Sequence, residues 1–229
     1  MIYAICCFIW NFNCFCVEPY IDLFRTTNAI TNIPELFPTA KESMISHLMA
    51  PSCFLDDDMA NEVKGLVEAL PDGTALVHGD GHPCNVLLCG ESPSRSLMLI
   101  DMGDIACGHP IMEIIGWTFL MNGNDLSPSK IIGPRIIGLD YEFMQTMFRK
   151  MITSYLKLSD EETIDQAVEA AANLGAIRFI CMDQVRNLPP EKQQRSIAMC
   201  KMAIEKKQEL LESMAYLTEL IDTCLVSGR

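Results

Sequence analysis

The chain has 229 residues, of which 49% are hydrophobic and 21% charged, and its formal net charge is -13. This length is sufficient for one compact domain with a sizeable core. The acidic charge argues against a nucleic-acid partner, which would require a basic binding face. The eleven cysteines include no C-x-x-C pair. They therefore indicate neither a disulfide framework nor a zinc ribbon and favour reduced thiols in a cytoplasmic protein.

The first 17 residues are strongly apolar and aromatic, but they match no targeting signal. They lack the basic start and the small-residue cleavage site of a signal peptide. The run is shorter than the ~20 residues of a membrane-spanning helix, and it contains Asn11 and Asn13. We expect this part either to pack as a strand or helix or to be a non-native start. Residues 1–35 are set apart as an N-terminal segment of uncertain structure, with no stable membrane span.

Two amphipathic stretches follow, at residues 38–49 and 56–70, and the second ends at a Pro-Asp-Gly turn. Both are predicted to be helices. The second opens with three consecutive aspartates at residues 56–58. These have the composition of a metal site, but we interpret them as the acidic first turn of a helix, which the helix dipole favours.

The most informative segment spans residues 77–103 and reads VHGDGHPCNVLL, a polar gap, and LMLIDMGD. Pro83 and two glycines prevent a helix between residues 79 and 85, so this part is predicted to be a loop. Apolar runs at 86–88 and 97–100 are predicted strands, because the connector between them is rich in turn-forming residues. The two strands form a hairpin that brings Asn85 close to Asp101.

Asp80, Asn85 and Asp101 have an order and spacing that phosphoryl transfer can use. Asp80 would accept the proton of an attacking hydroxyl. Asn85 and Asp101 would supply hard oxygen ligands for Mg²⁺ on the phosphates of ATP. The chemistry requires such groups because the transferring phosphoryl carries dispersed negative charge that must be positioned and neutralised. In the alternative, the three residues are a loop cap, a turn residue and a strand end without chemistry.

At these residues the chain resembles the aminoglycoside phosphotransferase and choline kinase family, relatives of the protein kinases. That family carries an H-G-D-x-x-x-x-N loop followed by a strand that ends in hydrophobic-hydrophobic-D, which match residues 78–85 and 99–101 here. The resemblance implies that Asp80 is the catalytic base, that Asn85 and Asp101 bind Mg²⁺, and that ATP is the phosphoryl donor.

Three further residues are expected to have supporting roles. By the resemblance, His78 braces the loop rather than reacts, and Asp104 matches an acidic position that the family often has after the metal-binding aspartate. His82 is counted with them. The spacing of His78 and His82 is that of helical zinc ligands, but Pro83 and the glycines argue against a helix there, and hence against zinc.

The resemblance covers residues 36–229 and implies an α+β, mainly helical, kinase-like C-terminal lobe with a small hairpin at the active site. Two residues depart from the family pattern, which usually has a bulky residue at Gly81 and a small one at Cys84. A β-rich N-terminal lobe is expected to be missing, because no glycine precedes Gly65 and Lys41 lies in a helical pattern. Without that lobe the site would be wet, so we expect this chain alone to bind Mg²⁺-ATP poorly.

The remaining chain is predicted to be helical. Residues 110–121 are apolar almost throughout, as in a buried helix, and a second helix is predicted over residues 140–158. Ser159 and Glu162 form a predicted capping box for the next helix. A Pro-Pro pair at 189–190 then separates it from one long final helix.

Other polar residues have competing interpretations. His82 and His109 have the chemistry of metal ligands, with a role that involves no metal as the alternative. Arg178 and Arg186 lie on a predicted helix and are suited to meeting an anionic group, although we favour a solvated surface for both.

Two classes of function stay open. The first is an enzyme that transfers the γ-phosphoryl group of ATP to the hydroxyl of a small molecule. The second is a truncated, inactive kinase-like remnant or binding module. The resemblance leaves the acceptor open, because relatives use aminoglycosides, choline, amino alcohols and sugars. The oligomeric state has no signal in the sequence.

Overall fold

The computed structural model describes residues 17–31, 36–82, 85–89, 96–121 and 141–227. Within these ranges the chain forms eight α-helices and two small antiparallel sheets of two strands each. The helices are α2 (Val17–Asn28), α3 (Ala40–Leu48), α4 (Asp57–Ala69), α5 (Ile111–Met121), α7 (Tyr141–Tyr155), α8 (Glu161–Gln184), α9 (Pro190–Glu205) and α10 (Lys207–Ser227). The strands are β1 (Ala75–Val77), β2 (Val86–Cys89), β3 (Ser96–Leu99) and β4 (Ala106–Gly108).

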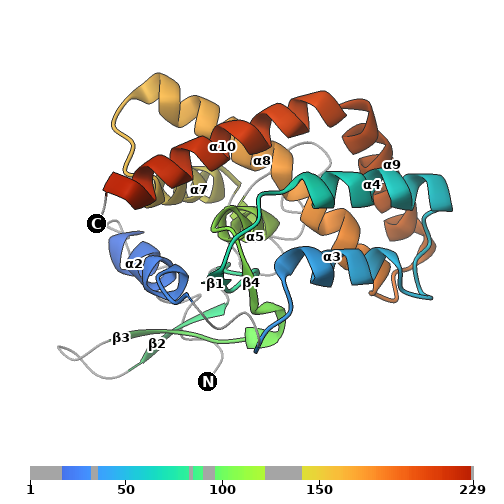
Figure 1. Cartoon of the computed structure of the whole chain (residues 1–229), viewed down its shortest axis with the longest axis horizontal. Helices are drawn as coiled ribbons and strands as arrows, with labels where there is room; N and C mark the ends of the chain where they lie inside the picture. Colours follow the sequence, from blue (N-terminus) through green and yellow to red (C-terminus); the bar gives the residue numbers. More distant parts are fainter. Residues whose placement is uncertain (1–16, 32–35, 83–84, 90–95, 122–140, 228–229) are drawn as a thin grey trace.

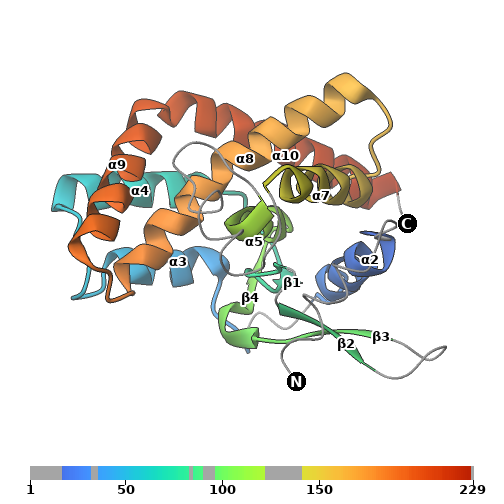
Figure 2. The ribbon, with the colours of Figure 1, turned by 180° about the vertical axis from the view of Figure 1, so that it is seen from behind.

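The predicted α+β, mainly helical class is therefore confirmed, whereas its assignment to a kinase-like lobe stays a prediction. Helices α8 and α10 lie on the side of the molecule opposite the β2–β3 hairpin, with α5 and the β1–β4 sheet between them (Figure 1 and Figure 2). None of the described helices is long and apolar enough to cross a membrane.

Helix α2 belongs to the same core as the rest of the chain. Tyr20, Ile21 and Phe24 are buried on one of its faces and join the main hydrophobic cluster. The sequence interpretation had placed the start of the domain at Leu36, beyond this helix. Residues 1–16, which include most of the apolar N-terminal run, lie outside the described residues.

The helix starts at α3 and α4 follow local capping rules. Thr39 and Glu42 form a capping box at α3. At α4, the Asp56 side chain accepts a hydrogen bond from the Met59 N–H, and the two following aspartates lie in the first turn. The interpretation of this acidic triplet as a helix start is confirmed.

The predicted hairpin is confirmed as well. Strands β2 and β3 pair antiparallel, with Val86 opposite Leu99. Strand β1 pairs with β4, so that Val77 lies opposite Ala106. A short 3-10 helix, η2 (Met102–Asp104), lies between β3 and β4. The loop after β1 and the segment after β3 are therefore held beside each other by strand pairing.

Helix α8 lies at the centre of the helical part and packs against α3, α4, α5, α7, α9 and α10. Every residue from Leu174 to Cys181 is buried. A helix without a solvent face over such a stretch is typical of a domain core.

Two predictions about the C-terminal half are wrong. The N-cap of α8 is Asp160, which accepts a hydrogen bond from the Thr163 N–H, and not Ser159. Aspartate is itself a strong N-cap, and counting from it Glu162 is one residue short of the position that a capping box requires. The long final helix is in fact two helices, interrupted at Lys206. This break lets both α9 and α10 pack against α8.

Helix α5 packs directly against the loop that follows β1. A Cβ added to Gly116 would lie 2.6 Å from the carbonyl oxygen of Gly79, whereas a Cβ added to Gly65 in α4 would meet nothing within 4 Å. The two helical glycines therefore differ in the space that is available for an added methyl group.

We expect Gly65→Ala to raise the free energy of unfolding by roughly 0.5–1 kcal/mol, since alanine is the better helix former. Gly116→Ala should lower it by roughly 1–3 kcal/mol, since the added methyl group overpacks a backbone contact. Urea unfolding of both variants measures these differences. Stabilisation by both substitutions would contradict the close packing of α5 on the loop.

Candidate active site

The loop that carries Asp80 depends on two glycines. Gly79 has a φ of 74°, and a Cβ there would lie 2.8 Å from the carbonyl oxygen of Asp104, so only glycine fits without strain. A Cβ at Gly81 would come within 2.4 Å of the Phe24 ring. The bulky residue that the resemblance leads one to expect at position 81 has no room here, because Phe24 and Trp117 occupy that space.

His78 joins this loop to the end of β3. It is fully buried, and its Nδ1 accepts a hydrogen bond from the Asp80 N–H at 3.3 Å. Its Nε2 lies 2.9 Å from the carbonyl oxygen of Ile100. A nitrogen that faces a carbonyl oxygen must carry the proton. Nε2 therefore carries a proton, and the ring connects two backbone segments.

Asn85 lies against Asp80. Its Nδ2 donates to the backbone oxygen of Asp80 at 2.9 Å and to the carboxylate Oδ2 at 3.2 Å. Both bonds use the amide nitrogen, so neither occupies the amide oxygen, which is the atom that a hard cation would take.

Asp101 follows directly from the hairpin register. The N–H of Ile100 donates to the backbone oxygen of Asn85 at 2.9 Å, which places Asp101 one residue beyond that pairing. Asp101 is exposed, and it is the left-handed residue, with φ 57°, from which η2 starts. Metal binding by Asn85 and Asp101 stays a prediction.

Arg178 is buried at the site, and its interpretation as a solvated surface residue is wrong. It is 6% exposed. Its Nη2 lies 3.0 Å from Asp80 Oδ1 and 2.9 Å from Asp104 Oδ2. The solvated role does fit Arg186, whose half-exposed side chain pairs with Asp183. Sequence could have separated the two, because Arg178 lies between apolar neighbours on every side of its helix.

The surroundings of the Asp80 carboxylate favour its ionised form. Burial raises the pKa of Asp80, but the hydrogen bond from His82 and the charge of Arg178 outweigh that effect, and the net pKa lies below the ordinary value. The His82 Nε2 is 3.5 Å from Asp80 Oδ2. The Asp80 side chain is still 20% exposed, so the carboxylate is not closed off from solvent.

Glu113 is a site residue that the sequence analysis missed. It is fully buried in α5, and its Oε1 accepts hydrogen bonds from the His78 N–H at 2.5 Å and from Asn28 Nδ2 at 3.2 Å. Asn28 in turn accepts from the Tyr155 hydroxyl at 2.6 Å. Burial raises the pKa of Glu113 to about 7, although these hydrogen bonds oppose the shift. A lone carboxylate in the otherwise apolar stretch 111–121 was the available signal.

His109 has a structural role. Its Nδ1 accepts from the Ile111 N–H, and its Nε2 lies 3.2 Å from Asp222. Among the described residues, no group of three or more His, Cys, Asp or Glu side chains is arranged to hold a metal ion.

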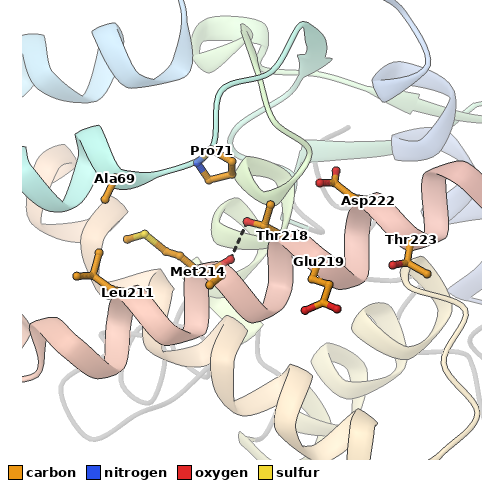
Figure 3. Close-up of a pocket in the computed structure, with 9 residues that line it drawn as sticks. Ala69, Pro71, Leu211, Met214, Thr218, Glu219, Asp222 and Thr223 are labelled. Atoms are coloured by element: carbon orange, nitrogen blue, oxygen red, sulfur yellow. Dashed lines mark hydrogen bonds between the residues drawn. The ribbon is translucent and has the colours of Figure 1, made fainter.

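A pocket of ≈ 560 Å³ lies between the end of α4 and α10 (Figure 3). Pro71, Met214 and Thr218 contribute to its wall, and Glu219 and Asp222 add negative charge. None of the predicted site residues lines it. It is therefore separate from the Asp80 loop.

Comparison of the chain with protein-family models and with curated proteins gives no match. The likeness at residues 78–101 to the aminoglycoside phosphotransferase and choline kinase family thus remains a prediction from the sequence.

The raised pKa of Glu113 predicts a pH-dependent stability. Glu113 keeps its proton in the folded state until the pH passes about 7, against 4.5 for an ordinary glutamate. The folded state binds more protons between these values, so its stability falls as the pH rises through this window. The wild-type chain loses this stability as the pH rises, whereas Glu113→Gln does not. The free energy of unfolding of the variant, measured relative to wild type, should therefore rise by up to about 3 kcal/mol from pH 5 to pH 8.

Urea unfolding at both pH values measures this change, with the exposed Glu219→Gln as control. Glutamine keeps an oxygen that accepts from the His78 N–H, so the variant tests the charge rather than the hydrogen bond. A difference between Glu113→Gln and wild type that does not change with pH would contradict the prediction.

Proposed function

We propose that this chain is part of a phosphotransferase that moves the γ-phosphoryl group of ATP to the hydroxyl of a small molecule. The observation that carries the proposal is the environment of Asp80. This carboxylate is largely buried, ionised and partly accessible, and it accepts a hydrogen bond from Asn85. It belongs to a loop that Glu113 holds through the backbone of His78.

Asp80 would act mainly by orienting the acceptor hydroxyl. A carboxylate with a lowered pKa is a weak base, so it takes the proton late in the reaction. Phosphoryl transfer has a loose transition state, in which the attacking oxygen needs to be positioned more than to be deprotonated early. A weak, firmly held base suits this requirement.

The residues present fit a magnesium ion that is shared with a nucleotide. Mg²⁺ is usually held by one or two protein oxygen ligands together with substrate phosphates and water. Asn85 turns its nitrogen to Asp80 and keeps its oxygen out of those bonds, and Asp101 is exposed one residue beyond the backbone hydrogen bond from Ile100 to Asn85. When bound there, the ion would neutralise charge on the phosphates.

The acceptor class follows from access and charge. The Asp80 side chain is partly exposed, which suits a small-molecule hydroxyl, and the net charge of -13 suits a neutral or cationic acceptor. The alternative is a kinase-like remnant without catalytic activity, and the experiment below distinguishes the two.

The proposal predicts different effects for Asp80→Asn and Asp101→Asn. Asp80→Asn should lower kcat by ~10²–10⁴-fold, the usual contribution of a general base, and leave the affinity for Mg²⁺-ATP nearly unchanged. Asp101→Asn should weaken Mg²⁺-ATP binding itself. Asp72→Asn is the control, because Asp72 is 95% exposed and pairs only with Lys41 among the described contacts.

Isothermal titration with Mg²⁺-ATP measures the binding of each variant. Transfer of labelled γ-phosphate to a panel of amino alcohols, sugars and aminoglycosides measures the activity. Equal, mild effects of both substitutions would show that the roles are misassigned. Binding by the wild-type chain is expected to be weak, so the titration extends to high Mg²⁺-ATP concentration, and absence of both binding and transfer there would favour the inactive remnant.

A further inference from the structure

Arg178 requires an explanation that core packing does not supply. It lies in the middle of the buried run of α8, between Ile177 and Phe179, and is 6% exposed. A buried guanidinium is costly unless it is paired, because it gives up its hydration. An apolar residue at this position would pack against the other helices without that cost.

The two partners of Arg178 come from different segments. Asp80 belongs to the loop after β1, and Asp104 ends η2 after β3. One nitrogen, Nη2, lies within 3.0 Å of an oxygen from each. The two segments also touch through their backbones, since a Cβ at Gly79 would lie 2.8 Å from the Asp104 oxygen. The guanidinium therefore neutralises two carboxylates that would otherwise repel each other.

We propose that Arg178 is a positioning residue of the site. It joins the loop of the base Asp80 to the segment that starts at Asp101 and ends at Asp104, and so sets the spacing between base and metal ligand. It also lies 3.0 Å from Oδ1 of Asp80, as an ion pair without a hydrogen bond, while Oδ2 faces Asn85 and His82. The positioning role rests on the function proposed above, whereas the double ion pair does not.

A thermal double-mutant cycle tests the ion pair without any activity. With Arg178 present, Asp80→Asn or Asp104→Asn removes a partner of a buried cation and should lower the Tm. In the Arg178→Met background the same changes remove repulsion between two uncompensated carboxylates and should raise it. We expect each effect to differ between the backgrounds by on the order of 5–10 °C.

The chain contains a matched control for this cycle. Arg149 also pairs with two carboxylates, those of Glu161 and Asp165, but at the exposed surface. Its cycle should be additive within about 2 °C, because exposed ion pairs contribute little. Additivity in the Arg178 cycle as well would contradict the double ion pair. If Arg178→Met does not fold, Arg178→Gln replaces it, since glutamine also removes the positive charge but keeps a polar end.

Steady-state kinetics test the positioning role well below the Tm of each variant. Arg178→Gln should lower kcat by ~10–100-fold, the effect of a small misplacement of reacting groups, with KM for both substrates within about threefold, and Arg178→Lys should recover part of the loss. An unchanged kcat in Arg178→Gln would overturn positioning. A wild-type chain without transferase activity even at high Mg²⁺-ATP concentration would overturn the proposed function and this role together, and a non-additive thermal cycle would still establish the double ion pair.

Discussion

The hydrogen bond between the buried Glu113 carboxylate and the backbone N–H of His78 is the interaction on which the candidate site depends. It connects the interior of α5 to the loop of Asp80, and through Asn28 and Tyr155 it extends to α2 and α7. An isolated charge at this depth would be strongly unfavourable, and the pKa of about 7 expresses that cost. Three helices are thus coupled to one loop. A shift of the loop would therefore expose buried polar groups or break their hydrogen bonds.

Arg178 restrains the same loop through a different contact. Glu113 contacts the backbone of the loop, and Arg178 contacts the carboxylate that the loop presents. Buried ionic groups of this kind contribute little net stability, because desolvation offsets their attraction, but they tolerate few alternative arrangements. The core of this chain therefore includes two buried ionisable residues at positions where apolar residues would pack, and both contact the segment around Asp80.

Patterns within short stretches of sequence were sufficient to predict the hairpin, α4 with its aspartate start, and the buried α5. Each rests on turn residues, capping and periodicity, which act over a few residues. The pairing of β1 with β4, the burial of Arg178 and the role of Glu113 depend on contacts between segments far apart in the chain. The preference for a solvated Arg178 followed the average behaviour of arginine and gave too little weight to its apolar neighbours.

Helix α2 shows what a comparison by motif alone leaves out. Phe24 fills the space beside Gly81, the Tyr20 hydroxyl donates to the Gly81 carbonyl oxygen, and Asn28 bonds to Glu113. The glycine at position 81, which departs from the family pattern, is thus matched by an aromatic side chain supplied from another part of the chain. Because the loop of Asp80 packs on α2 as closely as on α5, the support of the site begins before residue 36, where the sequence likeness begins. A lobe that started at that residue would leave the aromatic and polar contacts of this loop without partners.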